Sequence, residues 1–313
     1  MDENSALRLY TRSLAGQWNA DRDLDWSQST ALGSPELEAA RHRLVNDLYW
    51  SERQSLWTVK RMNIPIHRYF NDHHFSLVAA AHTFDESRHV YVLERYCETI
   101  GGVKECPLLW RVITRVADFA GNSVVNYFYS ILVSETLGEV LFAMLRHSKG
   151  DALLKAICER ALRDEARHIA YVNEALRRIH PRLGTVGRLR TKWVLRSMIY
   201  FGLRGLRKNQ ADAAALGIGQ EEYLDYFERK LIGSIRRAGI EAVLSPGEVH
   251  DLVAPFRTSS AELVDRAEVA ELTALEEGTG EVPLLRFTSP AILTQAAPAA
   301  RPSSAKRPGP GRN

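Results

Sequence analysis

One short string of residues occurs twice, and it constrains the fold of this 313-residue chain more than any other feature. It reads DESRH at 85–89 and DEARH at 164–168, and each copy contains Glu-x-x-His. Residues three apart share one face of a helix, so each copy can present a carboxylate oxygen and an imidazole nitrogen to one metal ion. Carboxylate combined with imidazole suits iron or manganese. The repeat therefore predicts a helical metal-binding protein.

The surrounding sequence predicts four long helices with short connections. Ser34 can cap the first helix, Pro35 suits its first turn, and Pro65 is expected to interrupt the chain before the second. A short helix is expected after Pro107, with a break near Gly121. No period-two alternation is strong enough to predict a sheet. An antiparallel four-helix bundle is expected, with helices at about 35–61, 69–100, 123–146 and 151–180.

The rest of the chain is expected to lie around this bundle. Two more helical patterns, at about 186–209 and 220–239, should pack outside it. The end of the chain is rich in Pro, Ala and Arg and cannot bury a core. The expected organisation is an N-terminal extension at 1–34, the bundle at 35–180, additional helices at 181–253, and a poorly ordered segment at 254–313.

Two further carboxylates lie on the helices that precede the repeated strings. Glu52 lies 34 residues before Glu86, and Glu135 lies 30 residues before Glu165, each in mostly apolar sequence. The alternative is that the strings are solvated faces carrying i,i+3 and i,i+4 charge pairs. The duplication favours the metal hypothesis, because buried unpaired carboxylates cost several kcal/mol and need cations between them.

Composition sets outer limits on function. The chain is 45% hydrophobic and 25% charged, with a net charge of +3, which is too small to indicate nucleic acid. Cys97, Cys106 and Cys158 form no CxxC pair, so neither a disulfide framework nor a sulfur zinc site is indicated. No apolar run is long enough for a membrane span, and the first residues do not resemble a signal peptide. A cytoplasmic protein is expected.

The repeated strings and their upstream carboxylates resemble the ferritin-like di-iron carboxylate superfamily. This superfamily includes multicomponent monooxygenase hydroxylases, acyl-carrier-protein desaturases, the ribonucleotide reductase small subunit and p-aminobenzoate N-oxygenase. The resemblance covers about 40–180, and DLDWSQ at 23–28 is also similar to N-terminal segments of the N-oxygenase-like branch. It implies an all-α ferritin-like four-helix bundle holding two irons, bridged by Glu86 and Glu165 and completed by Glu52 with His89 and by Glu135 with His168.

Neighbouring polar residues are expected to support such a site. Asp85 and Asp164 would accept the free ring N–H of the ligand histidines, and Arg88 and Arg167 would keep these aspartates ionised. The alternative for all four residues is ordinary surface charge.

Two residues are candidate extra ligands. His82 lies four residues before Glu86 on the same helix face, where it could bind a metal, donate a hydrogen bond to the site, or simply be a core residue. Glu139 lies four residues after Glu135 and could be a spare carboxylate. The N-oxygenases are known for a histidine additional to the usual metal ligands, which lies on the last bundle helix four residues before its Glu. The matching position in this chain is Ala161.

The resemblance implies a non-haem di-iron oxidoreductase that uses O2 as co-substrate, with two Fe ions or a mixed Mn/Fe pair. It would hydroxylate, N-oxygenate or desaturate a small or carrier-bound organic substrate, in secondary metabolism or lipid modification. No catalytic residue beyond the metal ligands is expected. The radical tyrosine of a ribonucleotide reductase would be expected at Leu93, so that role is disfavoured. Two alternatives remain: an iron- or peroxide-handling protein without an organic substrate, and a helical interaction protein with charge clusters only.

The segment at 182–208 carries eight basic residues and no acidic one, with apolar residues at helical spacing. It could be an ordinary amphipathic helix with a solvated basic face. The functional interpretations are docking of an acidic electron donor (a ferredoxin or reductase), docking of an acidic carrier protein, or contact with anionic lipid. A homodimer is also considered, and no nucleic-acid partner is expected.

Overall fold

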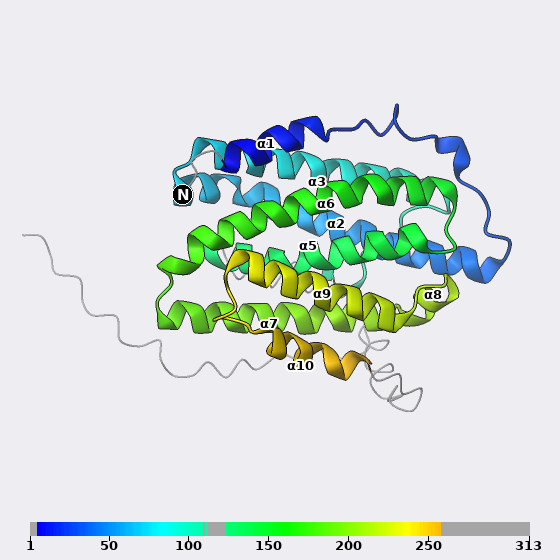
Figure 1. Ribbon diagram of the computed structural model, residues 1–313. Coiled ribbons are helices and arrows are strands. Elements are labelled where there is room, and N and C mark those ends of the chain that lie inside the picture. Colours follow the sequence, from blue (N-terminus) through cyan, green and yellow to red (C-terminus); the bar gives the residue numbers. More distant parts are fainter. Residues whose placement is uncertain (1–4, 109, 112–122, 258–313) are drawn as a thin grey trace, which may run out of the picture. The chain divides into compact units, whose positions relative to one another are not determined.

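The computed structural model describes residues 5–108, 110–111 and 123–257, and this part of the chain contains helices and no strands. Four long helices lie side by side (Figure 1), with α2 packed on α3 and α5 packed on α6 as antiparallel pairs. The prediction of an all-α bundle with additional C-terminal helices is therefore confirmed. The four helices are α2 (Pro35–Phe70), α3 (His73–Thr99), α5 (Val124–His147) and α6 (Ala152–Ile179).

The first bundle helix is longer than the sequence predicted. Ser34 caps α2 as expected, since its hydroxyl accepts from the Leu37 amide at 3.2 Å, but the helix continues through Pro65 to Phe70. The prediction of an interruption at Pro65 was wrong. A proline removes one helical hydrogen bond, whereas the neighbouring turns are anchored by buried apolar side chains. The chain turns instead at Asn71, which adopts a left-handed conformation with φ of 48°.

The connection between the two helix pairs also differs from expectation. In Figure 1, α3 and α5 run in the same direction, so the end of α3 and the start of α5 lie at opposite ends of the bundle. The predicted antiparallel arrangement with short connections therefore holds within each helix pair but not between α3 and α5, whose parallel order occurs in some natural four-helix bundles. The break predicted near Gly121, and most of the short helix predicted after Pro107, lie outside the described residues.

Further helices cover two sides of the bundle (Figure 1). The N-terminal helix packs on α3 and α6, whereas two of the C-terminal helices pack on α5. The helices predicted at 186–209 and 220–239 are α7 and α9, and most of the predicted C-terminal tail lies outside the described residues. The added elements are α1 (Ser5–Ala15), η1 (Trp26–Gln28), η2 (His180–Arg182), α7 (Thr185–Lys208), α8 (Gln210–Ala215), α9 (Gln220–Ala238) and α10 (Pro246–Arg257).

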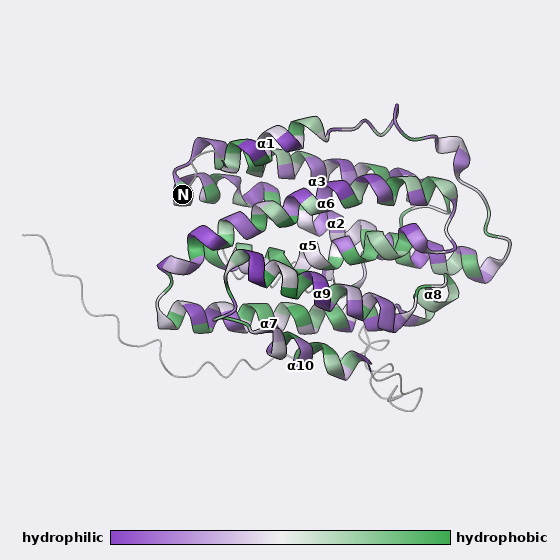
Figure 2. Ribbon diagram, viewed as in Figure 1, coloured by the Kyte–Doolittle hydropathy of each residue, from purple (hydrophilic) through white to green (hydrophobic). Residues whose placement is uncertain are grey.

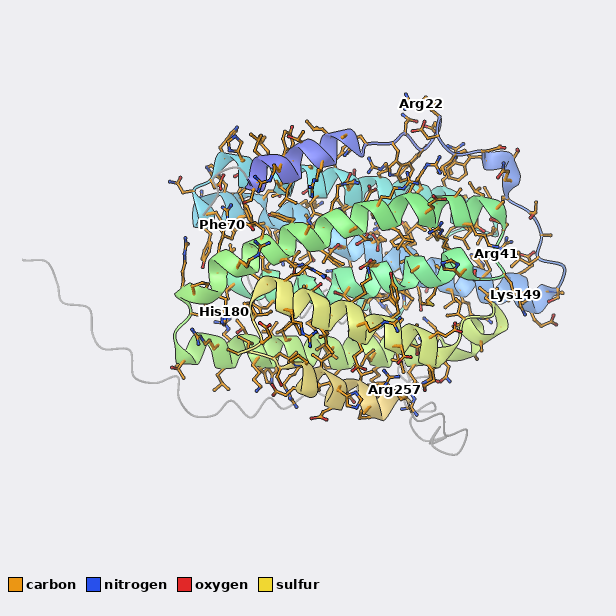
Figure 3. All side chains as sticks on the ribbon, viewed as in Figure 1. Arg22, Arg41, Phe70, Lys149, His180 and Arg257 are labelled. Carbon is orange, nitrogen blue, oxygen red and sulfur yellow. The ribbon has the colours of Figure 1, made fainter. Side chains whose placement is uncertain are left out.

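The central helix α5 is the most apolar of the described helices, whereas hydrophilic and hydrophobic residues are interspersed along the outer helices (Figure 2). By length and composition α5 alone among the described helices could cross a membrane, but 72% of its apolar window is buried inside the fold. It is thus the core helix of the bundle. Side chains fill the space between the helices, with Phe70 and His180 at one end and Arg41 and Lys149 at the other (Figure 3).

Candidate metal centre

The middle of the bundle contains buried acids and histidines from all four long helices. Glu52 comes from α2, Glu135 comes from α5, and the two repeated strings lie on α3 and α6. The six predicted ligands are all buried, with none more than 4% exposed. Around Glu135, the other residues of α5 are mostly apolar. The structure thus brings together all six predicted residues: Glu52, Glu86, His89, Glu135, Glu165 and His168.

These side chains form two groups, within each of which one possible ligand atom per residue lies within 4.8 Å of the others. In the first group, His168 Nδ1 lies 3.0 Å from Glu135 Oε2. In the second group, His89 Nδ1 lies 3.1 Å from Glu52 Oε2. The first group consists of His82, Glu86, Glu135 and His168, and the second of Glu52, Glu86, His89 and Glu165.

Two carboxylates lie between the groups. Glu86 belongs to both, and its Oε1 is 3.4 Å from His168 Nδ1. Glu165 reaches both histidines, with Oε1 3.3 Å from His89 Nδ1 and Oε2 3.6 Å from His168 Nδ1. Carboxylates shared in this way can each contact two ions.

The donor set fits two divalent cations. Within the described residues, Glu86 Oε2 and both ring nitrogens of His82 are buried without a hydrogen-bond partner. Buried polar atoms are normally satisfied, and several carboxylates this close together repel one another unless cations lie between them. Four carboxylates combined with imidazoles are ligands that iron and manganese accept. The chemistry of these residues therefore suits a pair of such ions.

The outward-facing nitrogen of each histidine lies beside an aspartate from the opposite string. His89 Nε2, on α3, is 3.0 Å from Asp164 Oδ2 on α6. His168 Nε2, on α6, is 3.5 Å from Asp85 Oδ2 on α3. Asp164, which accepts from His89 Nε2, leaves His89 Nδ1 available toward the carboxylates. Asp85 faces His168 Nε2 in the matching place, although this nitrogen forms no hydrogen bond within the described residues.

The two arginines of the repeats lie between the aspartates. Arg88 donates to Asp85 at 2.6 Å and to Asp164 at 2.8 Å, and Arg167 donates to Asp164 and to Asp85. Burial opposes ionisation, yet the nearby His168, with Nε2 3.5 Å from Asp85 Oδ2, and the charge of Arg88 lower the pKa of Asp85 to about 2. The pKa of Asp164 is likewise held far below its usual range, since His89 and both guanidinium groups outweigh burial. Both aspartates are therefore anionic acceptors at neutral pH.

The sequence analysis missed the N-terminal residues that complete this network. Trp18 Nε1 donates to Asp164 at 2.9 Å, and Gln17 Nε2 donates to Asp85 at 3.0 Å. Arg88 in turn donates to Gln17 Oε1 at 2.6 Å and lies over the Trp18 ring. No local motif distinguishes Gln17 and Trp18, and the segment noted at 23–28 lies too far along the chain. Their role follows only from the docking of the N-terminal segment on α3 and α6.

Glu139 is not brought to either group. It is buried on α5, where it forms an ion pair with Lys230 of α9. The cation that compensates this carboxylate is thus a lysine.

Protons compensate part of the negative charge when the site holds no ion. Burial, reinforced by the charge of Glu86, raises the pKa of Glu52 to about 7, and burial together with Glu135 raises that of Glu165 well above its usual value. Burial disfavours a charged His89, but its hydrogen bonds to Asp164 and Glu52 outweigh this and raise its pKa well above the ordinary value. Metal ions must displace these protons.

Metal binding is therefore expected to release about two protons or more per chain and to tighten as the pH rises from about 6 to 8. Groups with raised pKa values hold their protons at the lower pH, so the competition from protons weakens on the alkaline side. Calorimetric titration of the metal-free protein in buffers of different ionisation enthalpy measures the proton count. Identical heats in all buffers would contradict this expectation.

Gly138 lies against the carboxylates. A Cβ at this position would be 3.7 Å from Glu165 Oε2 and 3.8 Å from Glu52 Oε1, which is ordinary contact. Gly138→Ala is expected to retain metal binding and to stabilise α5 by about 0.5–1 kcal/mol, whereas the branched Gly138→Val should displace the carboxylates and weaken metal binding about tenfold. Thermal unfolding and metal titration of both variants test this. Equal metal affinities in the two would show that the carboxylates do not need this space.

Comparison with known proteins places the chain in a family. The family model described as "P-aminobenzoate N-oxygenase AurF" matches residues 62–225, which is more than half of the chain. The chain belongs to this family. The matched residues contain both repeated strings and Glu135, whereas Glu52 lies before them. No curated protein sequence matches the chain.

Solved structures show the same fold. The solved structures include three mutants of an R2-like ligand-binding oxidase with an anaerobically reconstituted Mn/Fe cofactor. Each is 16% identical in sequence to this chain. Each superposes with a TM-score of 0.51 over 80% of this chain and 90 or 91% of the oxidase. The ferritin-like bundle is thus confirmed.

Family membership and the buried donor groups together make this protein a di-iron type oxidoreductase that uses O2. The predicted di-iron enzyme class is confirmed. The individual ligand assignments remain predictions.

Proposed function

We propose that the chain transfers an oxygen atom from O2 to a small or carrier-bound organic substrate at a two-metal centre in the bundle. The observation that carries this proposal is the pair of buried donor groups sharing Glu86, in a chain of the N-oxygenase family. In this proposal Glu86 and Glu165, which lie between the two groups, would contact both ions. Glu52 with His89 completes one ion, and Glu135 with His168 completes the other.

The bound metal pair supplies the electrons that activate O2. The protein residues would hold the ions and exclude bulk water from the centre, and Asp164 would keep His89 in one tautomer while Asp85 faces His168 Nε2. We propose N-oxygenation of an aromatic amine as the first reaction, following the description of the family. One oxygen atom joins the amine nitrogen and the other leaves as water, with two electrons and two protons from an external donor.

The test is a turnover assay with the iron-loaded protein, p-aminobenzoate and O2 labelled with oxygen-18. The expected result is a product carrying one labelled atom, detected by mass spectrometry, which depends on added reductant. A screen of other amines, and of fatty acyl groups on carrier proteins, follows if p-aminobenzoate is not oxidised. Accumulation of ferric iron without an oxygenated product from any of these would contradict an oxygenase and support iron handling.

Glu139→Gln is the matched control for variants of the six proposed ligands. It removes one buried carboxylate charge from α5, one helical turn from Glu135, while keeping an acceptor for Lys230. This variant is expected to retain two ions per chain. Loss of iron in Glu139→Gln as large as in Glu135→Gln would contradict the assignment of Glu135.

We further propose that an acidic electron-donor protein binds the outer face of α7. This helix carries seven basic residues and no acidic one, and α7 packs directly on α5, where Gly202 lies against Leu137, two residues beyond Glu135. A donor on this face would therefore be one helix away from the metal groups. The exposed apolar residues of the face are Val186, Leu189, Trp193, Tyr200 and Phe201.

Reversing charge on this face is expected to weaken donor binding about tenfold or more at low salt, without changing metal content. The variant is Arg188→Glu with Arg190→Glu, and the probe is a reduced plant-type [2Fe–2S] ferredoxin. Arg12→Glu with Arg68→Glu alters the same charge away from α7 as a control. Equal binding by both double variants would contradict this docking face. Size-exclusion chromatography of the chain alone and with an acidic carrier protein then shows whether a second copy of the chain or a carrier protein binds this face instead.

We place this activity in the cytoplasm. The three cysteines are free thiols and two of them are buried, which fits a reducing compartment. Secretion of the active enzyme by its native host would contradict this placement.

A further inference from the structure

His82 is buried in the first group without a hydrogen-bond partner. It lies on α3 one helical turn before Glu86, only 2% exposed, and neither ring nitrogen forms a hydrogen bond within the described residues. Its Nε2 is 3.3 Å from Glu86 Oε1 and 3.5 Å from Glu135 Oε1. A core histidine would normally donate or accept at least one hydrogen bond. This ring instead directs a nitrogen toward two carboxylates.

The ring of His82 lies beside that of His168. Their centroids are 3.9 Å apart with an interplanar angle of 32°, so the two histidines approach the same carboxylates from adjacent helices, α3 and α6. The four possible ligand atoms of the first group all lie within 4.8 Å of one another. Two ligands on opposite sides of one divalent ion at about 2.2 Å are about 4.4 Å apart. The group is therefore nearly the size of a single coordination sphere.

The second group has no counterpart of His82. Ala161 occupies the matching position, four residues before Glu165, and it is completely buried and offers no ligand atom. The first group thus presents two imidazoles and two carboxylates. The second group presents one imidazole and three carboxylates. The duplicated sequence gives two similar half-sites, and His82 makes them unequal.

We propose that His82 is a seventh metal ligand, through Nε2, and that it makes the first group the iron-selective position that fills before the second. Imidazole nitrogen favours iron over manganese more than carboxylate oxygen does, so the group with two imidazoles is the better iron site. The second group, with a single imidazole, remains the weaker and harder iron site. This inference rests on the proposed function, since it assumes that the two groups hold two metal ions.

The first test is anaerobic titration of the metal-free protein with iron-57 as Fe(II), followed by Mössbauer spectroscopy and metal analysis. With one equivalent, the wild type is expected to show one ferrous environment, and a second should appear only with further iron. His82→Ala and His82→Gln should bind the first ion about tenfold or more weakly and show two environments at one equivalent. Tyr171→Phe, which removes only a hydroxyl from a ring packed against His82, should behave as wild type.

The outcomes separate the inference from the function on which it rests. A wild type that binds no iron overturns both. Two bound ions with wild-type affinity and spectra in His82→Ala and His82→Gln would overturn the role of His82 and leave the six-residue site intact. Circular dichroism of the metal-free variants checks that they are folded.

A second measurement uses the unmodified protein and so does not depend on the folding of a variant. Wild-type protein labelled with nitrogen-15 histidine and loaded with Mn(II) and Fe(II) is studied by electron–nuclear double resonance. Three coupled imidazole nitrogens across the two ions are expected, corresponding to His82, His89 and His168. Two coupled nitrogens would overturn the proposal.

Discussion

Glu86→Ala is expected to reduce bound iron to less than about one ion per chain and to lower O2-dependent turnover about a hundredfold or more. Glu86 is the residue that both groups share, and its Oε2 has no hydrogen-bond partner within the described residues. Its loss therefore removes a donor from both proposed ions at once. Metal analysis after anaerobic reconstitution and a single-turnover assay measure the two effects.

Thermal unfolding of the metal-free variant distinguishes the loss of a metal ligand from damage to the fold. Removing the carboxylate of Glu86 relieves repulsion in the metal-free site, because Glu52 loses a like charge beside it. Glu86→Gln keeps the volume and is expected to unfold at no lower temperature than the metal-free wild type. Excess Fe(II) at a hundred times Kd should raise the free energy of unfolding of the wild type by about 2.7 kcal/mol, and this stabilisation should be absent in the variant. Full retention of iron would contradict the bridging role.

The fold and the main metal residues could be predicted because the sequence carries them as local patterns. Glu-x-x-His at helical spacing places Glu86 and His89 on one face, and the second copy does the same for Glu165 and His168. Caps at Ser34 and Asp151 start α2 and α6 through side-chain contacts within three residues. Such interactions are short in sequence, so one chain suffices to predict them.

The rest depends on contacts between distant segments. The crossing of Asp85 to His168, and of Asp164 to His89, requires knowing which repeat faces which. Trp18 reaches Asp164 over 146 residues of sequence, with no motif to mark it. The continuation of α2 through Pro65 depends on buried apolar side chains that outweigh one lost backbone hydrogen bond. Tertiary packing, rather than local propensity, decides each of these features.

Asp164→Ala is expected to weaken metal binding about 10- to 100-fold and to destabilise the metal-free protein by about 3–5 kcal/mol. Asp164 is completely buried and accepts from Arg88, Arg167 and Trp18 while facing His89 Nε2 at 3.0 Å. Its removal leaves the buried guanidinium group of Arg88 and the partly buried one of Arg167 short of an anion. The same change removes the acceptor that fixes the tautomer of His89. The free energy of unfolding and the affinity for metal should therefore fall together.

Asp151→Ala provides the matched control, because it breaks a buried ion pair of the same helix without touching the metal groups. Asp151 caps α6 and pairs with Arg41 at 2.7 Å and with the Tyr96 hydroxyl at 2.8 Å. Its replacement should cost a similar 3–5 kcal/mol in chemical denaturation but leave the affinity of the folded protein for Fe(II) within about threefold of wild type. If both aspartate variants lost metal affinity equally, general loosening of the bundle would explain the effect. A loss confined to Asp164→Ala means that α6 supports the ions through the crossed Asp164–His89 contact.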